Sequence, residues 1–119
     1  MRVYTRERVL APLATAISNN GYEVNEMKER AIEKRLVTEV KKHGGLAMKF
    51  ISPGFDGVPD RIVLLPGGKM GFVELKAPGQ IMRPLQVQRK RQLEGLGFLV
   101  YCVDGIEQIG GVLHEIQSA

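Results

Sequence analysis

The chain has 119 residues, and 44% of them are hydrophobic, which is enough to build the core of one domain. Its single cysteine, Cys102, excludes an internal disulfide and a cysteine-rich zinc site, and it favours a reducing compartment. The formal charge of +4 suits a polyanionic partner, and no apolar run approaches the roughly 20 residues that a membrane span requires.

The first residues of the chain imitate a signal peptide only loosely. Arginines precede an apolar stretch at residues 9–17, but a proline and a threonine interrupt that stretch, and Glu7 lies among the arginines. We therefore predict a short helix at residues 5–18, ended by a turn at residues 19–21. The expected location is the cytoplasm.

A stronger helix is predicted at residues 27–43. Leu36 and Val40 belong to an apolar stripe that recurs every four residues, and two glycines follow the helix. We accordingly divide the chain into an N-terminal helical appendage at residues 1–26 and a main domain at residues 27–119.

The pattern then changes to that of β-strands. Short runs of apolar and β-branched residues predict strands at residues 46–51, 61–65 and 71–76. Proline and glycine interrupt the chain between the first two strands, and the glycine-rich segment at residues 66–70 is typical of a hairpin loop.

The remaining elements complete an α/β pattern. Pro84 suits the first turn of a helix at residues 84–96, and the apolar run at residues 98–103 is typical of a strand buried on both faces. A final helix is predicted at residues 106–116 despite its two glycines. The order α, then α-β-β-β-α-β, then α predicts a mixed α/β domain with one central sheet flanked by helices.

The predicted hairpin carries a cluster of charged residues. Glu74 and Lys76 are two positions apart on one strand, so both side chains point to the same face. If Leu65 pairs with Gly71, Asp60 lies opposite Lys76 and diagonal to Glu74, at about 7 Å or less. A register shift of one residue would move Asp60 to the other face and remove the cluster.

Two carboxylates on one face could hold one divalent cation. Oxygen ligands of this kind suit Mg²⁺, which keeps several waters and is completed by a substrate phosphate. Lys76 could then orient the attacking water or neutralise charge on the phosphate. Glu-x-Lys alone is also common on solvent-facing strands, and Asp60, directly after Pro59, is what favours a catalytic cluster.

Glu33 is a further candidate for this cluster. Its helical spacing from Leu36 and Val40 turns its carboxylate toward the packed side, where a buried charge requires a partner. A metal site or Lys76 would provide that partner. The alternative is a glutamate at the edge of the helix, paired with a lysine of the same helix.

The helix predicted at residues 84–96 is basic. Four cationic side chains surround Gln86, namely Arg83, Arg89, Lys90 and Arg91. Beside a metal site such a surface would bind DNA phosphates, which set affinity without reading sequence. The alternative is a solvated charged face with no partner. The leucines at positions 85, 93 and 96 are predicted to face the sheet.

Taken together, these segments resemble a known nuclease signature. The sequence GVPD at residues 57–60 and the sequence FVELK at residues 72–76, separated by a strand and a glycine turn, match the PD-(D/E)XK signature. The sequences APG at residues 77–79 and RPLQ at residues 83–86 resemble the VRR-NUC (virus-type replication-repair nuclease) branch. The similarity extends over residues 27–103 and is to the short stand-alone members of phages and bacteria.

The resemblance implies a restriction-endonuclease-like fold with a metal-dependent site. Asp60, Glu74 and the backbone carbonyl of Leu75 would ligate Mg²⁺ or Mn²⁺, and Lys76 would assist the nucleophilic water. Hydrolysis in this superfamily leaves 5′-phosphate and 3′-hydroxyl ends.

The resemblance also implies further site residues, a substrate and an assembly. Gln86 matches a glutamine that these nucleases add to the site, and Glu33 matches the glutamate of the first core helix. Stand-alone members resemble Holliday-junction resolvases and act as homodimers. We therefore expect a structure-specific endonuclease for branched DNA, acting in phage replication, repair or recombination inside a bacterial cell or a phage-infected host.

Two other functions stay open on the sequence. One is a less selective nuclease of the flap-cutting or restriction type, although no separate target-recognition domain is visible. The other is a non-catalytic DNA-binding module on the same fold. The intact pair Asp60 and Glu74, together with Lys76, argues against the binding module, because a degenerate site has no need of them.

Overall fold

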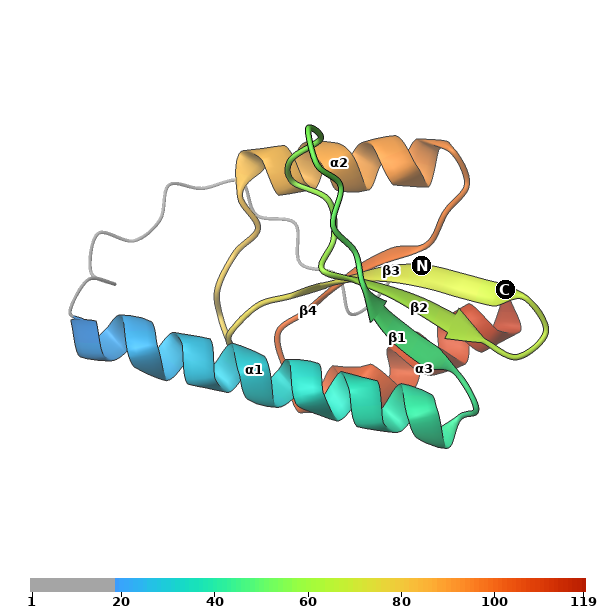
Figure 1. The fold of residues 1–119 in the computed structure, drawn as a ribbon, viewed down its shortest axis with the longest axis horizontal. Helices are drawn as coiled ribbons and strands as arrows, with labels where there is room; N and C mark the ends of the chain where they lie inside the picture. The colour runs from blue at the N-terminus through green and yellow to red at the C-terminus, as the bar shows by residue number, and fades with distance from the viewer. Residues whose placement is uncertain (1–18) are drawn as a thin grey trace.

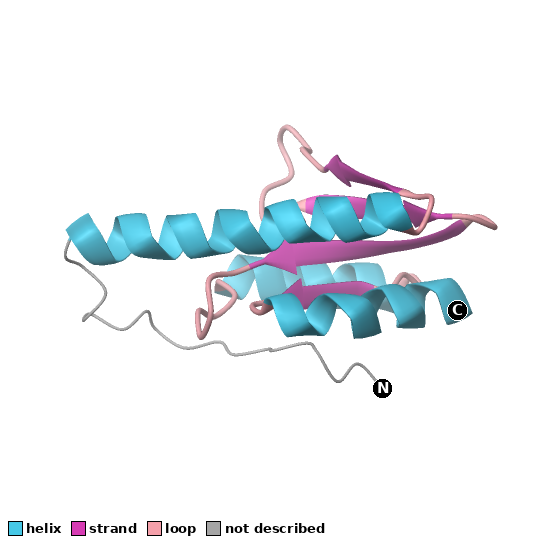
Figure 2. Ribbon diagram, turned by 90° about the horizontal axis from the view of Figure 1, so that it is seen from below, coloured by secondary structure: helices cyan, strands magenta, loops and turns pink. Residues whose placement is uncertain are grey.

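The computed structural model describes residues 19–119 as three layers, with a four-stranded sheet between helices (Figure 1 and Figure 2). In chain order the elements are α1 (Asn19–Lys42), β1 (Leu46–Lys49), β2 (Arg61–Leu65), β3 (Lys69–Leu75), α2 (Pro84–Gly95), β4 (Val100–Val103), η2 (Ile106–Gln108) and α3 (Ile109–Ser118). The predicted α/β fold with a central mixed sheet is confirmed. The helix predicted at residues 5–18 lies outside the described residues.

Helix α1 begins earlier than predicted. It starts at Asn19 instead of Met27 and continues without a break to Lys42. Asparagine and glycine often end a helix, but asparagine also often begins one, and the turn predicted at residues 19–21 is therefore wrong. The division of the chain after residue 26 stays a prediction, and α1 crosses that position.

The sheet has the strand order β1-β2-β3-β4. β1, β2 and β3 are antiparallel neighbours, whereas β4 runs parallel to β3 because α2 carries the chain back along the sheet. In the turn between β2 and β3, Gly67 and Gly68 have φ angles of 84° and 73°, which glycine adopts without steric cost. The tight turn brings the residue before β2 next to the last residues of β3.

One face of the sheet carries the main apolar core, under α1 and α3 (Figure 1). Its buried residues are Ile32, Leu36, Val40, Val63, Leu65, Val73, Leu75, Tyr101, Val103, Ile109, Val112, Leu113 and Ile116. The apolar stripe predicted on α1 is confirmed, since Leu36 and Val40 are fully buried. Gly71 lets α3 approach β3 closely, because a Cβ there would lie 2.8 Å from Ile116 Cδ1.

The opposite face of the sheet is covered by α2 and has a smaller apolar cluster, formed by Met82, Val87 and Cys102. Cys102 packs as a small apolar residue, as predicted. The predicted orientation of α2 is wrong, because Leu85 and Leu96 are 39% and 75% exposed. The residues that α2 buries are Gln86, Val87 and Lys90.

Within residues 19–119, none of the helices combines the length and the apolar character needed to cross a bilayer.

Candidate active site

The predicted charged cluster forms where β2 begins, β3 ends and α2 begins. The pairing of β2 with β3 places Asp60 directly opposite Glu74, one step beyond the last paired residues. This register differs from the predicted one, since Leu65 pairs with Lys69 and not with Gly71. The difference is two residues, which leaves every side chain on its face, and the two carboxylates therefore still meet.

Asp60 is held by the backbone of the neighbouring strand. Its Oδ2 accepts a hydrogen bond of 2.8 Å from the N–H of Leu75. Burial raises the pKa of Asp60, and the Leu75 hydrogen bond and the charge of Lys76 oppose this rise. The charge of Glu33 raises the same pKa. Asp60 thus lies in a partly buried position close to other carboxylates.

Glu74 is 2% exposed, and its two carboxylate oxygens differ in environment. Oε2 accepts a hydrogen bond of 2.6 Å from Gln86 Nε2 and lies 3.4 Å from Lys76 Nζ. Oε1 is buried without a hydrogen-bond partner among residues 19–119. Burial and the charge of Asp60 raise the pKa of Glu74 to about 8. The pair of carboxyl groups therefore retains a proton near neutral pH, and a cation bound by both groups would displace it.

Lys76 brings a positive charge to both carboxyl groups. Its backbone N–H donates to the carbonyl oxygen of Val103 at 2.9 Å, so the pairing with β4 extends past the end of β3. The Lys76 side chain is 14% exposed, and its charge lowers the pKa of Asp60 and of Glu74. The Lys76 side chain is thus mostly buried next to the carboxyl group of Glu74.

Gln86 connects the start of α2 to Glu74. Pro84 occupies the first turn of α2, which follows Arg83. Gln86 Oε1 accepts a hydrogen bond of 2.9 Å from the Arg83 N–H, while Nε2 donates to Glu74. A glutamine three residues after the N-cap often bonds back in this way. The Gln86 amide thus accepts a hydrogen bond from a backbone N–H at the start of α2 and fixes the buried carboxylate of Glu74.

The structure gives Glu33 a partner that the sequence did not indicate. Glu33 Oε2 accepts a hydrogen bond of 2.9 Å from Arg61 Nε, and Arg61 Nη1 donates to the carbonyl oxygen of Ala47 at 2.9 Å. Arg61 therefore takes the place expected for Lys76 or for a lysine of α1. Glu33 remains close enough to the cluster for its charge to raise the pKa of Asp60.

Glu29, one turn before Glu33 on α1, was not identified from the sequence. Partial burial and the charge of Asp60 raise the pKa of Glu29, and the charge of Lys76 lowers it. The effects of Asp60 and Lys76 on its pKa place Glu29 close to the cluster. The available signal was its spacing, because residues four apart share a helix face, but spacing alone does not favour Glu29 over Glu33.

Two of the predicted DNA-contacting residues are exposed, and one is buried. Arg83 and Arg91 lie on the surface of α2. Lys90 is 3% exposed, and its Nζ lies 2.8 Å from Glu94 Oε2. The prediction that Lys90 forms part of the basic surface is wrong, because Lys90 is buried and its ammonium group forms an ion pair with Glu94.

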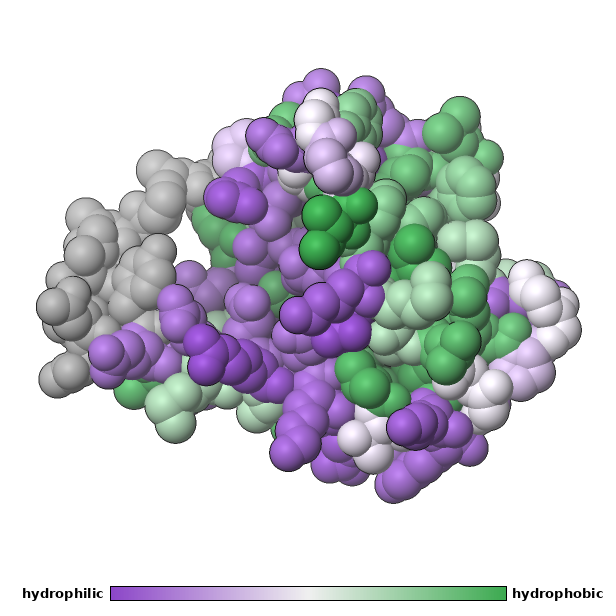
Figure 3. Space-filling model, viewed as in Figure 1, coloured by the Kyte–Doolittle hydropathy of each residue, from purple (hydrophilic) through white to green (hydrophobic). Residues whose placement is uncertain are grey.

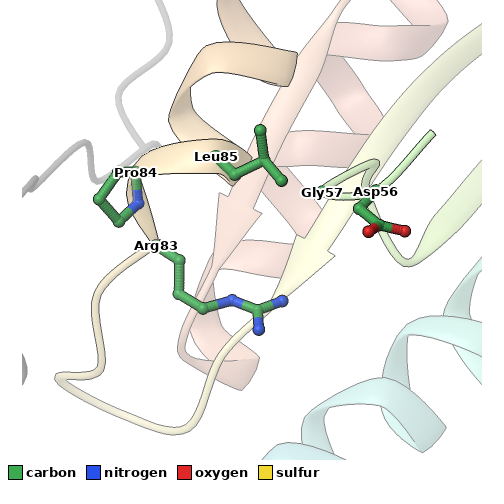
Figure 4. Close-up of a pocket in the computed structure, with 5 residues that line it drawn as sticks. All are labelled: Asp56, Gly57, Arg83, Pro84 and Leu85. Atoms are coloured by element: carbon green, nitrogen blue, oxygen red, sulfur yellow. The ribbon is translucent and has the colours of Figure 1, made fainter.

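Arg89 anchors the loop that precedes Asp60. Its Nε donates to the carbonyl oxygen of Asp56 at 2.7 Å, and its guanidinium carbon lies 3.7 Å from the ring centroid of Phe55. In Figure 4, side chains from the first turn of α2 extend toward this loop. The space between them is a pocket of about 580 Å³ lined by Asp56, Gly57, Arg83, Pro84 and Leu85.

The chemistry of the cluster fits a hard divalent cation. Residues 19–119 contain no group of three His, Cys, Asp or Glu side chains arranged as a complete metal site. Asp60 and Glu74 nevertheless offer two carboxylates, and Glu74 Oε1 is a buried oxygen that lacks a hydrogen bond. Mg²⁺ is commonly bound through one or two carboxylates with waters and substrate phosphate in its remaining positions, so this donor set is sufficient.

The chain matches no family model. Over 78 residues it is 53% identical to a protein named "Putative nuclease p44" of Acyrthosiphon pisum secondary endosymbiont phage 1, and the match covers 66% of this chain and 84% of that protein. A solved structure described as a VRR_NUC domain superposes with a TM-score of 0.69 at 28% identity, over 73% of this chain and 95% of that one.

Proposed function

This chain belongs to the VRR-NUC family of nucleases, and on that basis we propose that it hydrolyses phosphodiester bonds of DNA as a metal-dependent endonuclease. The preferred substrate in this proposal is branched DNA, above all the four-way junction, and the active form is a homodimer. The observation that carries the proposal is the buried Glu74, opposite Asp60 and beside Lys76.

In this proposal Asp60, Glu74 and the backbone carbonyl of Leu75 hold Mg²⁺ or Mn²⁺. The cation would supply a Lewis acid for the scissile phosphate and lower the pKa of a water. Glu74 offers the buried Oε1 for this purpose, since its other oxygen is held by Gln86. The hydrogen bond from Gln86 fixes the orientation of the carboxylate before substrate binds.

Lys76 acts on the substrate side of the cluster. Its side chain is 14% exposed and its Nζ lies 3.4 Å from Glu74 Oε2, so it is positioned to neutralise charge that develops on the phosphate and to orient the attacking water. The products are 5′-phosphate and 3′-hydroxyl ends. Arg83 and Arg91, which are exposed on α2, contribute contacts to phosphates farther along the strand.

The third carboxylate of the site is Glu29 or Glu33. Glu33 is engaged by Arg61, whereas Glu29 is influenced mainly by burial and by Asp60. We expect Glu29→Gln to reduce cleavage more than Glu33→Gln, with the larger loss of stability in Glu33→Gln because Arg61 loses its partner. Cleavage rates and melting temperatures of both variants test this assignment, and the opposite order would favour Glu33 as the third acidic residue of the site.

A homodimer suits a junction that needs two symmetric nicks, because the described residues contain one such cluster per chain. The edge strand β1 offers apolar side chains for an interface, since Leu46 and Met48 are 58% and 45% exposed. Apolar surface also gathers on this side of the molecule in Figure 3. Sedimentation of wild type and Met48→Glu tests the dimer, which the variant should dissociate.

Cleavage of a labelled DNA panel tests the function directly. The panel contains a four-way junction, a flap, a splayed arm, a linear duplex and a single strand, each with Mg²⁺, Mn²⁺ or EDTA. We expect paired nicks on the junction that disappear with EDTA. Preferential cutting of the other DNA forms would keep the metal mechanism and overturn the substrate. Binding without any cutting would reject the enzyme and favour a non-catalytic DNA-binding module.

A further inference from the structure

The loop between β1 and β2 is a structured protrusion that leads directly into Asp60. At its root the Phe50 N–H donates to the carbonyl oxygen of Asp60 at 2.9 Å, and at its tip the Phe55 N–H donates to the carbonyl oxygen of Ser52 at 3.1 Å. Gly54 has a φ angle of 78°, a conformation that permits the reversal there. The loop is therefore anchored at its root beside Asp60, and its tip lies against α2.

Helix α2 fixes this loop from one side. Arg89 bonds to the carbonyl oxygen of Asp56 and stacks its guanidinium on the Phe55 ring. Gly57 touches Leu85, since a Cβ at position 57 would lie 2.7 Å from Leu85 Cγ. The loop is thus attached to the helix that also supplies Gln86 to the cluster, and the position of Phe55 is set relative to Glu74.

Phe55 serves neither of the two apolar clusters of residues 19–119 and is 45% exposed. An exposed aromatic ring that a guanidinium group holds in place offers an apolar face next to a positive charge. Nucleobases next to phosphates have the complementary character, because every base has an apolar π-face and a nearby anion. The exposed Arg83, across the pocket from the same loop, adds a second positive charge.

We infer that Phe55, oriented by Arg89, stacks on a nucleobase exposed at the branch point of the DNA substrate. This inference rests on the proposed action on branched DNA, and it assigns to Phe55 the discrimination between branched DNA and linear duplex. In a continuous duplex both faces of each base are covered by neighbouring bases. At a branch the stack is interrupted, and an exposed ring on the loop that leads into Asp60 can cover the exposed face. Phe55 is thus a specificity-determining residue and takes no part in hydrolysis.

Fluorescence of 2-aminopurine at the branch point tests the contact without any cleavage. The labelled four-way junction and a linear duplex with the same label are titrated with protein in EDTA and again in Ca²⁺. The variants are Phe55→Ala, Phe55→Tyr, which keeps an aromatic ring, and Leu96→Ala, which removes an equally apolar and more exposed side chain elsewhere on the surface.

Wild type and Phe55→Tyr should change the fluorescence of the junction. Phe55→Ala should abolish the change and weaken junction binding about tenfold, within the range of base–aromatic stacking. Its affinity for the duplex should stay within about twofold, as should both affinities of Leu96→Ala. An unchanged signal in Phe55→Ala, or an equal loss on junction and duplex, overturns the inference.

Cleavage of the same junction with Mg²⁺ separates this inference from the proposed function. Stacking by wild type without cleavage would reject the enzyme and keep the role of Phe55. Cleavage by Phe55→Ala with wild-type preference for the junction would keep the enzyme and reject that role. Absence of binding to either DNA form would reject both.

Discussion

The two faces of the central sheet are built from the same strands but differ in what they bury. Toward α1 and α3, β3 contributes Val73 and Leu75 to an apolar core drawn from five elements. Toward α2, the same strand contributes Glu74, and α2 buries the polar side chains of Gln86 and Lys90 besides its part of a small apolar cluster. Because side chains alternate along a strand, one short segment takes part in both environments.

The two faces differ in what they contribute, one to stability and the other to chemistry. Apolar burial stabilises a fold by about 25 cal/mol per Å², whereas a buried carboxylate without a full set of partners is destabilising. The α1–α3 face therefore supplies folding free energy, and part of it offsets the cost of holding Glu74 in the interior. If this division is correct, variants on the two faces should affect different measurements.

The largest effect is expected from Glu74→Gln on the α2 face. The substitution keeps the shape of the side chain and removes its charge, so cleavage should fall about 10³-fold, as for loss of one preorganised electrostatic group. Stability in EDTA should stay equal or increase, because an incompletely paired buried carboxylate has been removed. Single-turnover cleavage and thermal melting measure the two quantities, and an unfolded variant would contradict the division.

Leu36→Ala is the matching change on the α1–α3 face. Leu36 is 0% exposed, so truncation should reduce the free energy of unfolding by about 2–5 kcal/mol. Cleavage per folded molecule should change little below the melting transition. Urea unfolding and cleavage at low temperature check this, with Leu96→Ala, 75% exposed, as a control that should stay within about 0.5 kcal/mol.

Gln86→Ala should affect both measurements moderately, because Gln86 bonds to Glu74 and to the start of α2. We expect cleavage to fall about 10- to 100-fold, as for loss of an outer-shell partner of a metal ligand. Stability should fall by about 1 kcal/mol, as for loss of a helix cap. A variant with full activity would show that Gln86 is not needed to position Glu74, and the chemistry of the α2 face would then depend on β3 without help from α2.

The last prediction concerns stability alone, namely its pH dependence without metal. The pKa of Glu74 rises from its ordinary value of 4.5 to about 8 in the folded chain. The folded chain therefore holds more protons than the unfolded chain between these values, and stability should fall as pH rises through this window, by at most about 1.4 kcal/mol per pH unit. Urea midpoints in EDTA measure the slope, which should flatten in Glu74→Gln.

Much of the fold was predictable because its signals are local. The bounds of β2 follow from a β-branched run between proline-rich and glycine-rich segments, and the structure confirms residues 61–65. The alternation of Glu74 and Lys76 predicted their common face. The same alternation made the error in register harmless, because Asp60 stays on that face after a shift of two residues.

The rest depends on packing that a sequence does not contain. Glu29 and Glu33 share one face of α1, and only the rotation of α1 over the sheet directs Glu33 to Arg61. The rotation of α2 likewise exposes Leu85 and buries Lys90, against their usual preferences. Residues 19–21 are helical although asparagine and glycine commonly end a helix, because such local preferences are weak.

The bond between Gln86 and the Arg83 N–H also couples the proposed active site to local unfolding. Helix ends open far more often than the whole protein unfolds. Each time the first turn of α2 opens, Gln86 is drawn away from Glu74, and the carboxylate loses its fixed orientation. Heating should therefore inactivate the protein before it melts. Hydrogen exchange at the amide of Arg83 would report the equilibrium fraction of molecules in which this first turn is open.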